Sequence, residues 1–136
     1  MNDCDRIRNT IARLVHLYDR HDHAGWVEEC LTEDVKLEAG GYTLNGRQQV
    51  LETIAPVAWE SAEPGVWVGT HILSEPHIEL DGDRAAVLTD VMTVQIGDEP
   101  GQYKITSVHR YNDDFVRGPS GDWKISARRT EILGKE

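Results

Sequence analysis

The sequence predicts an α+β fold, with helices in the N-terminal part of the chain and an antiparallel sheet after them. Before Pro64, apolar residues recur at helical spacing in three segments. After Pro64 and Gly65 the pattern changes to four long segments of strand character, separated by stretches rich in turn formers. A chain of 136 residues is long enough for one domain with a hydrophobic core and short for two. We therefore expect a single domain over residues 1–136.

The N-terminal part contains three expected helices. The first is amphipathic, and its apolar positions are Ile7, Ile11, Leu14, Val15 and Tyr18. A second, shorter helix follows, with Asp22 as its N-cap. The third begins after Asn45 and Gly46, and Pro56 should end or kink it because proline lacks the backbone donor.

Strands are expected in two places. A short hairpin, Asp34 to Glu38 and Tyr42 to Leu44, precedes the third helix. The four long strands are expected at Val66 to Leu80, Arg84 to Ile96, Gln102 to Phe115 and Trp123 to Ile132. Helices on one face of such a curved sheet would enclose a pocket, so polar residues that face inward are candidates for function.

The composition argues against two classes of partner. The formal net charge is −10 and no cluster of Lys and Arg offsets it, so we expect neither a nucleic-acid nor a membrane partner. The sequence has no bilayer-spanning apolar run and no secretion signal, which indicates a cytoplasmic protein. Cys4 and Cys30 lack the spacing of a metal or redox pair, and we expect two reduced thiols.

Asp19 and His71 could form a catalytic pair. Asp19, in the segment LYDRHDHAGW, lies at the C-terminal end of the first helix, where the helix dipole disfavours a carboxylate. It either begins a turn in solvent or has a cationic or imidazole partner. His71, in WVGTHILSEP, has apolar neighbours on its strand, although a lone strand histidine is more often a core or edge residue. Paired with Asp19, the imidazole would be oriented to accept a proton.

Other polar residues leave alternatives open. Asp19, His21, Asp22 and His23 lie close in sequence, but their spacing across a turn does not fit a metal site, and we expect no metal. Asp90 is a charge in an apolar strand that could face the pocket or a subunit contact, because one bulge would reverse its direction.

Several segments resemble the SnoaL-like branch of the nuclear-transport-factor-2-like (NTF2-like) cone-fold superfamily. They are LYDRHDHAGW, LTEDVKLEAGG, LNGRQQVLETI, GTHILSEPHIELDGDRA and GDWKISARR, and the similarity covers nearly the whole chain. Within that branch the chain is most similar to the scytalone dehydratase and hexachlorocyclohexane dehydrochlorinase group. The resemblance implies three helices packed on a curved sheet and a catalytic dyad of Asp19 and His71. It also implies that Tyr18 holds a water against the substrate and that Arg128 assists a leaving anion.

The chain departs from that group at several positions. The second tyrosine of scytalone dehydratase would fall near Ala39, and its second histidine in the strand Arg84 to Ile96, which has none. The lysine of the dehydrochlorinase would fall at Leu14. The two aspartates of the related ketosteroid isomerases would fall at Ala39 and Ser107. These departures argue against scytalone, against halide elimination as that enzyme performs it, and against steroid isomerisation.

Alternation along the strands supplies the expected substrate contacts. If Ser107 and Arg128 face the pocket, Tyr103 and His109 lie on the same side, and Trp67 completes the expected set. His109 is either a second titrating group or a structural or interface residue.

We therefore expect a cofactor-independent lyase that performs a dehydratase-type elimination, or an isomerisation, on a small hydrophobic cyclic or polyketide-like molecule. The alternative is a non-catalytic module of the same fold that binds a small ligand or assembles with a partner, as the small subunit of aromatic-ring dioxygenases does. The resemblance also implies a homodimer or homotrimer formed through the outer face of the sheet.

Overall fold

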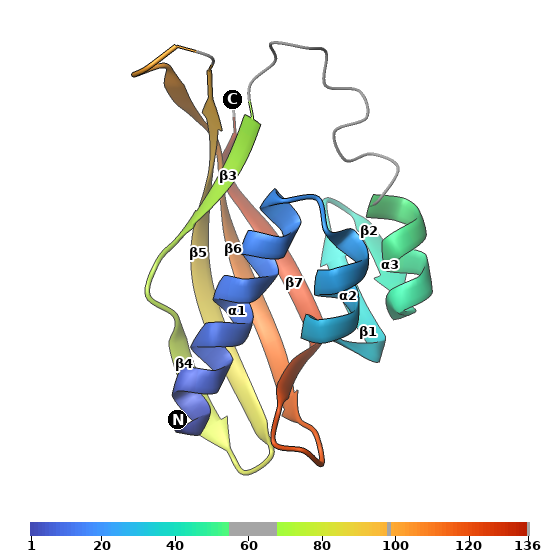
Figure 1. Ribbon diagram of the computed structural model, residues 1–136. Coiled ribbons are helices and arrows are strands. Elements are labelled where there is room, and N and C mark those ends of the chain that lie inside the picture. The colour runs from blue at the N-terminus through green and yellow to red at the C-terminus, as the bar shows by residue number, and fades with distance from the viewer. Residues whose placement is uncertain (55–67, 98, 136) are drawn as a thin grey trace.

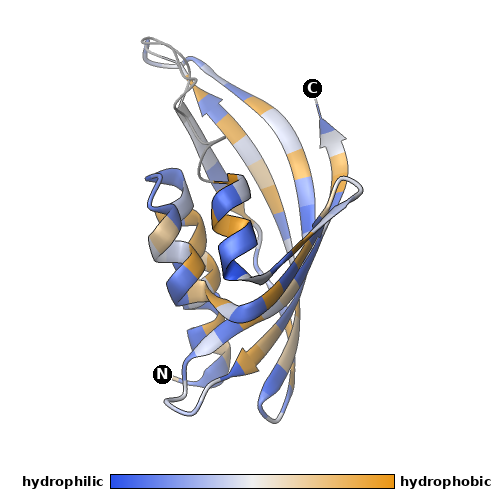
Figure 2. Ribbon diagram, turned by 90° about the vertical axis from the view of Figure 1, so that its right-hand side faces the viewer, coloured by the Kyte–Doolittle hydropathy of each residue, from blue (hydrophilic) through white to orange (hydrophobic). Residues whose placement is uncertain are grey.

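The computed structural model describes residues 1–54, 68–97 and 99–135, and it confirms the expected α+β architecture. The described helices are α1 (Asp3–Asp19), α2 (His23–Cys30) and α3 (Gly46–Ile54). The described strands are β1 (Leu31–Ala39), β2 (Tyr42–Asn45), β3 (Val68–Leu73), β4 (His77–Asp81), β5 (Arg84–Ile96), β6 (Tyr103–Arg117) and β7 (Trp123–Lys135). All three helices lie on one face of the curved sheet (Figures 1 and 2).

Side-chain capping determines where the first two helices begin. The side chain of Asn2 accepts a hydrogen bond from the amide of Asp5, at 2.8 Å, and caps α1. Asp22 caps α2 as predicted, because its side chain accepts from the amide of Gly25 at 2.9 Å. The expected break at Pro56 lies outside the described residues.

The sheet is mixed, which corrects the expectation that it is antiparallel throughout. Its strand order is β2-β1-β7-β6-β5-β3, and β4 pairs with β5. The neighbours β1 and β7 run parallel, with Leu37 beside Arg128, whereas the other pairs are antiparallel. The strands β1 and β7 are distant in the sequence, and they become neighbours where the sheet closes around the helices. The alternation of apolar and polar residues within a strand does not determine which strand it pairs with.

The expected strand from Val66 to Leu80 is wrong in its length, because the chain forms two strands, β3 and β4, in that region. Both pair with β5, and residues 74–76 separate them. Pro76 has no backbone donor for a ladder, and Ser74 instead bonds to the backbone of Asp90 through its amide and its hydroxyl.

The hydrophobic core lies between the helices and the inner face of the sheet. Alternate residues of β5, including Val87, Thr89 and Val91, are buried there. The apolar face of α1 packs onto this core through Ile7 and Ile11. In the part of the chain that the structure describes, no helix is both long enough and apolar enough to cross a membrane.

Candidate active site

The structure brings Asp19 and His71 into contact. Oδ1 of Asp19 lies 2.6 Å from Nδ1 of His71. Oδ2 of the same carboxylate accepts from the backbone amide of His71 at 3.0 Å and from the hydroxyl of Thr70 at 3.2 Å. These contacts from β3 offset the unfavourable position of a carboxylate at the C-terminal end of α1.

This geometry determines which nitrogen of His71 is available for chemistry. Because Asp19 can only accept at Nδ1 when ionised, the neutral imidazole carries its proton on Nδ1 and leaves Nε2 unprotonated. Both side chains are mostly shielded from solvent, with 17% and 16% exposure for His71 and Asp19. The pair can therefore accept a proton at Nε2 while Asp19 stabilises the imidazolium that forms.

His71 lines a cavity of about 250 Å³ between the helices and the inner face of the sheet. Apolar side chains from both layers, including Leu14, Trp26, Leu37 and Ile54, form much of its wall. Its polar lining includes Tyr18, His71, His109, Tyr111, Arg128 and Thr130. A small apolar cavity with a few convergent polar groups is typical of a site for a small molecule.

Tyr18 lies between two imidazoles at this cavity. Its ring is edge-on to His71, with centroids 5.2 Å apart, and edge-on to His23, with centroids 5.3 Å apart. Burial raises the pKa of the Tyr18 phenol, and the nearby Tyr111, Asp19 and Tyr42 raise it further. The phenol therefore stays protonated and can donate a hydrogen bond to a water or to a substrate oxygen.

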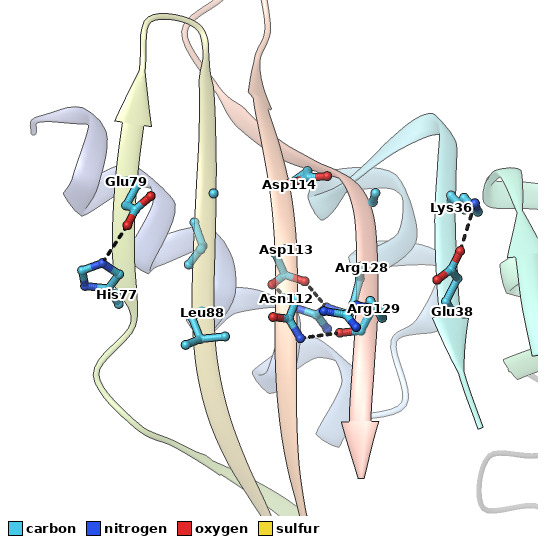
Figure 3. Close-up of a pocket in the computed structure, with 13 residues that line it drawn as sticks. Lys36, Glu38, His77, Glu79, Leu88, Asn112, Asp113, Asp114, Arg128 and Arg129 are labelled. Carbon is cyan, nitrogen blue, oxygen red and sulfur yellow. Dashed lines mark hydrogen bonds and ion pairs between the residues drawn. The ribbon is translucent and has the colours of Figure 1, made fainter. Parts of the chain in front are cut away.

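Arg128 reaches the cavity as a paired cation. Its Nε and Nη2 donate to the two carboxylate oxygens of Asp113, at 2.7 and 2.9 Å (Figure 3). Its guanidinium also stacks over the ring of Tyr111, 3.8 Å from the centroid. The resemblance implied that the guanidinium of Arg128 assists a leaving anion. Its positive charge is already offset by the carboxylate of Asp113.

His109 is a second imidazole in the same cavity. Its Nε2 lies 2.8 Å from the hydroxyl of Ser107, two residues earlier on β6. Burial lowers the pKa of His109, and the nearby His71 lowers it further. Ser107 pairs with Thr93 of β5, which pairs in turn with His71 of β3, and His109 follows Ser107 by two residues on β6. His71 and His109 therefore lie in neighbouring rows across the inner face of the sheet.

The SnoaL-like domain family matches residues 1–129 of this chain. The chain belongs to that family. No curated protein matches it.

Solved structures support the same fold for this SnoaL-like protein. Rv3472 from Mycobacterium tuberculosis, a protein of unknown function solved as a variant, is 28% identical, with a TM-score of 0.77 over 93% of this chain and 69% of its own. A candidate scytalone dehydratase from Novosphingobium aromaticivorans is 16% identical, with a TM-score of 0.78 over 97% of this chain and 85% of its own. An NTF2-like protein with a cystatin-like fold, also from Novosphingobium aromaticivorans, is 22% identical, with a TM-score of 0.77 over 98% and 84%. The α+β fold is therefore of the NTF2-like type, as the sequence indicated.

Tyr103 does not line the cavity of this SnoaL-like protein, which corrects the expected set of contacts. Its side chain is 69% exposed. The adjacent residues Thr93 and Val94 of β5 pair with Ser107 and Ile105 of β6, respectively. Thr106, between these two, is therefore an extra residue that forms a bulge in β6. This bulge turns Tyr103 to the face opposite Ser107. Ser107 was also expected to line the cavity, but it is not among the lining residues and contacts His109 instead. Trp67, the remaining expected contact, lies outside the described residues.

Tyr111 is a further candidate site residue that was not expected from the sequence. It lines the cavity, and the alternation that selected Ser107 and His109 would have reached it two residues further along β6. Burial raises the pKa of its phenol, Arg128 lowers it, and Asp113 and Asp19 raise it.

The residues first considered for a metal have other contacts. Asp22 caps α2, and Nδ1 of His23 accepts from the indole of Trp26 at 3.0 Å. Over residues 1–54, 68–97 and 99–135, no three or more His, Cys, Asp or Glu side chains gather in a group that could hold a metal ion.

A second hollow, of about 540 Å³, crosses the outer face of the sheet, with α1 behind the strands (Figure 3). Its charged residues pair locally, as in His77 with Glu79 at 3.3 Å and Lys36 with Glu38 at 2.9 Å. Asp90 also faces outward, where Arg110 donates two hydrogen bonds to its carboxylate, at 2.7 and 3.1 Å. Because Asp19 and His71 meet on the other face, the cavity beneath the helices is the candidate active site.

Proposed function

We propose that this SnoaL-like protein is a cofactor-independent lyase that eliminates water from a small hydrophobic cyclic or polyketide-like molecule. The supporting observation is the 2.6 Å contact between Asp19 and His71 at the wall of a small, mainly apolar cavity. A proton acceptor held by a carboxylate in a water-poor cavity is suited to removing a proton from carbon.

In the proposed reaction, Nε2 of His71 takes a proton from the carbon next to an activating carbonyl group. Asp19 holds the ring and stabilises its positive charge, and the imidazolium then gives the proton to the departing hydroxyl, which leaves as water. General acid–base catalysis of this type contributes roughly 10²- to 10⁴-fold to the rate. Return of the proton to a different carbon would give an isomerisation.

Tyr18 has a supporting role in this proposal. Its ring packs edge-on against His71, so its neutral hydroxyl can hold a water, or the leaving hydroxyl, near the imidazole. The name of the scytalone dehydratase candidate among the structural relatives is consistent with an elimination. Strand β5 contains no histidine, so we do not propose scytalone as the substrate.

The test begins with the coupling of the two residues. We expect substitution of Asp19→Asn to change the tautomer of His71, as measured from the NMR shifts of its ring nitrogens. Asp22→Asn is the matched control, because asparagine caps a helix as well as aspartate does and Asp22 is three residues from Asp19 in the sequence. An unchanged tautomer of His71 in Asp19→Asn would contradict the proposal.

The second stage separates catalysis from binding. Wild type and His71→Ala are incubated with small cyclic β-hydroxyketones, and mass spectrometry detects loss of water. We expect products only with wild type. If ligands bind and neither protein releases water, the domain is a binding module, which is the alternative function.

We also propose that the protein is a homodimer or homotrimer that associates through the outer face of the sheet. Large apolar side chains are exposed there on β3 and β6, among them Ile72, Tyr103 and Ile105. Exposed apolar patches of this kind are typical of interfaces.

A further inference from the structure

The phenol of Tyr111 has no hydrogen-bond partner among the described residues, although the residue is partly buried. Its ring lies against the guanidinium of Arg128, which two hydrogen bonds fix to Asp113. Asp113 is itself fully shielded from solvent. The position of the ring is therefore fixed, while the hydroxyl remains available at the cavity that Tyr111 lines.

A phenol at the wall of a cavity, with no partner in the protein, can donate its hydrogen bond to a ligand oxygen that enters the cavity. The phenol is also neutral in the working pH range, since burial raises its pKa. It can therefore donate to an oxygen that gains negative charge, as an oxyanion-hole donor does.

The charges around the cavity indicate whether this ligand oxygen belongs to an anionic group or to an uncharged one. Arg128 is offset by Asp113, His71 by Asp19, and Glu38 by Lys36. No cation among the described lining residues is left unpaired for a carboxylate or a phosphate. An uncharged carbonyl group requires only a donor, and Tyr111 supplies one.

We infer that Tyr111 is a further catalytic residue, which donates a hydrogen bond to the carbonyl oxygen of an uncharged ketone substrate, and that Arg128 fixes its ring instead of binding the leaving group. This inference rests on the proposed function. His71 takes the proton from the carbon next to the carbonyl, and the C–H electron pair forms the enolate, whose oxygen accepts from Tyr111. The enolate then reforms the carbonyl, a carbon–carbon double bond forms, and the hydroxyl leaves with the proton from His71 as water.

The test uses three bicyclic probes of similar size: the ketone α-tetralone, the hydrocarbon tetralin and the anion α-naphthoate. For wild type we expect α-tetralone to bind more tightly than α-naphthoate. We expect Tyr111→Phe to weaken α-tetralone binding about 5- to 10-fold, the loss expected for one hydrogen bond. Tetralin binding should not change, which also shows that the variant is folded.

Infrared spectroscopy of the bound ketone reports the hydrogen bond directly. Loss of the donor in Tyr111→Phe should move the carbonyl stretch of bound α-tetralone to higher wavenumber. Tyr103→Phe is the matched control, because this phenol is on the other face of the sheet, and it should change neither affinity nor spectrum. Equal α-tetralone affinity and an equal stretch in wild type and Tyr111→Phe would overturn the inference, as would tighter binding of α-naphthoate or no binding of α-tetralone.

His71→Ala separates this inference from the proposed function, because binding a ketone needs no base. The effect of Tyr111→Phe should persist in a His71→Ala background. If the effect persists while the tautomer of His71 proves independent of Asp19, the ketone site stands and only the elimination chemistry is lost.

Discussion

Asp113 accepts two hydrogen bonds from Arg128 in a site where its own side chain has no exposure to solvent. Removing one partner of a buried ion pair leaves an uncompensated charge, which costs about 3–5 kcal/mol. We therefore expect Asp113→Ala to lower the free energy of unfolding by about this amount, as measured by urea denaturation. Asp90→Ala removes the corresponding partner of Arg110 on the exposed outer face and should cost much less. Equal losses in the two variants would contradict this assignment.

The buried thiol of Cys30 should make the free energy of unfolding vary with pH in the alkaline range. Burial raises its pKa from 9.0 to about 11 in the folded protein. The unfolded chain therefore loses this proton at lower pH, and the stability should fall as the pH rises from 9.0 towards about 11. Urea denaturation across this range should give a smaller decrease for Cys30→Ala than for wild type. Cys4→Ala, at a thiol nearer to solvent, is the control and should behave as wild type does.

The two histidines of the cavity should titrate as neighbours. Burial lowers the pKa of His109 from 6.5, and His71 lowers it further. Removal of the second contribution in His71→Ala should raise the pKa of His109, as followed by NMR. The control is His77, which is exposed on β4 and whose ring signals should be the same in both proteins. A pKa of His109 that does not move would mean that the two imidazoles are not electrostatically coupled.

The same lowered pKa has a consequence for stability at acid pH. The unfolded chain takes up a proton at His109 near pH 6.5, whereas the folded protein does so only at lower pH. The contribution of His109 is therefore present above pH 6.5 and is lost as the pH falls through the folded pKa. His109→Gln should reduce the slope of unfolding free energy against pH in this range.

Local patterns in the sequence were sufficient for the helices and made Asp19 and His71 candidates for a pair, which the resemblance to the SnoaL-like branch then implied. Periodicity identified the buried face of α1, and the position of Asp22 identified the start of α2. The carboxylate of Asp19, badly placed for the helix dipole, pointed to a partner elsewhere, and the structure has His71 in contact with it. The helix features depend on residues within about one turn of each other, and the expectation of a partner for Asp19 depends on the charge of that one side chain.

The missed features depend on backbone contacts between distant segments. The bulge at Thr106 changes which residues of β6 face the cavity, and no side-chain pattern marks it. It is the reason that Tyr103 is exposed while Ser107 and His109 face inward. The parallel pairing of β1 with β7 is set by packing of the whole sheet. The break between β3 and β4 was also missed, although Pro76, which cannot donate to a strand ladder, lies inside the single strand that was expected from Val66 to Leu80.

The bulge also places large apolar side chains on the outer face, where they lead to a prediction about assembly. Ile72 and Ile105 are 48% and 51% exposed on neighbouring parts of the sheet. Burial of such side chains against a second copy is favourable by about 25 cal/mol per Å² of apolar surface. We expect the purified protein to sediment as a dimer or a trimer, and Ile72→Lys combined with Ile105→Lys to shift it towards the monomer. Leu80→Lys changes an equally apolar, exposed position on β4 and serves as the control. Sedimentation of wild type as a monomer at high concentration would contradict this expectation, because the lysine variants would then have no interface to disrupt.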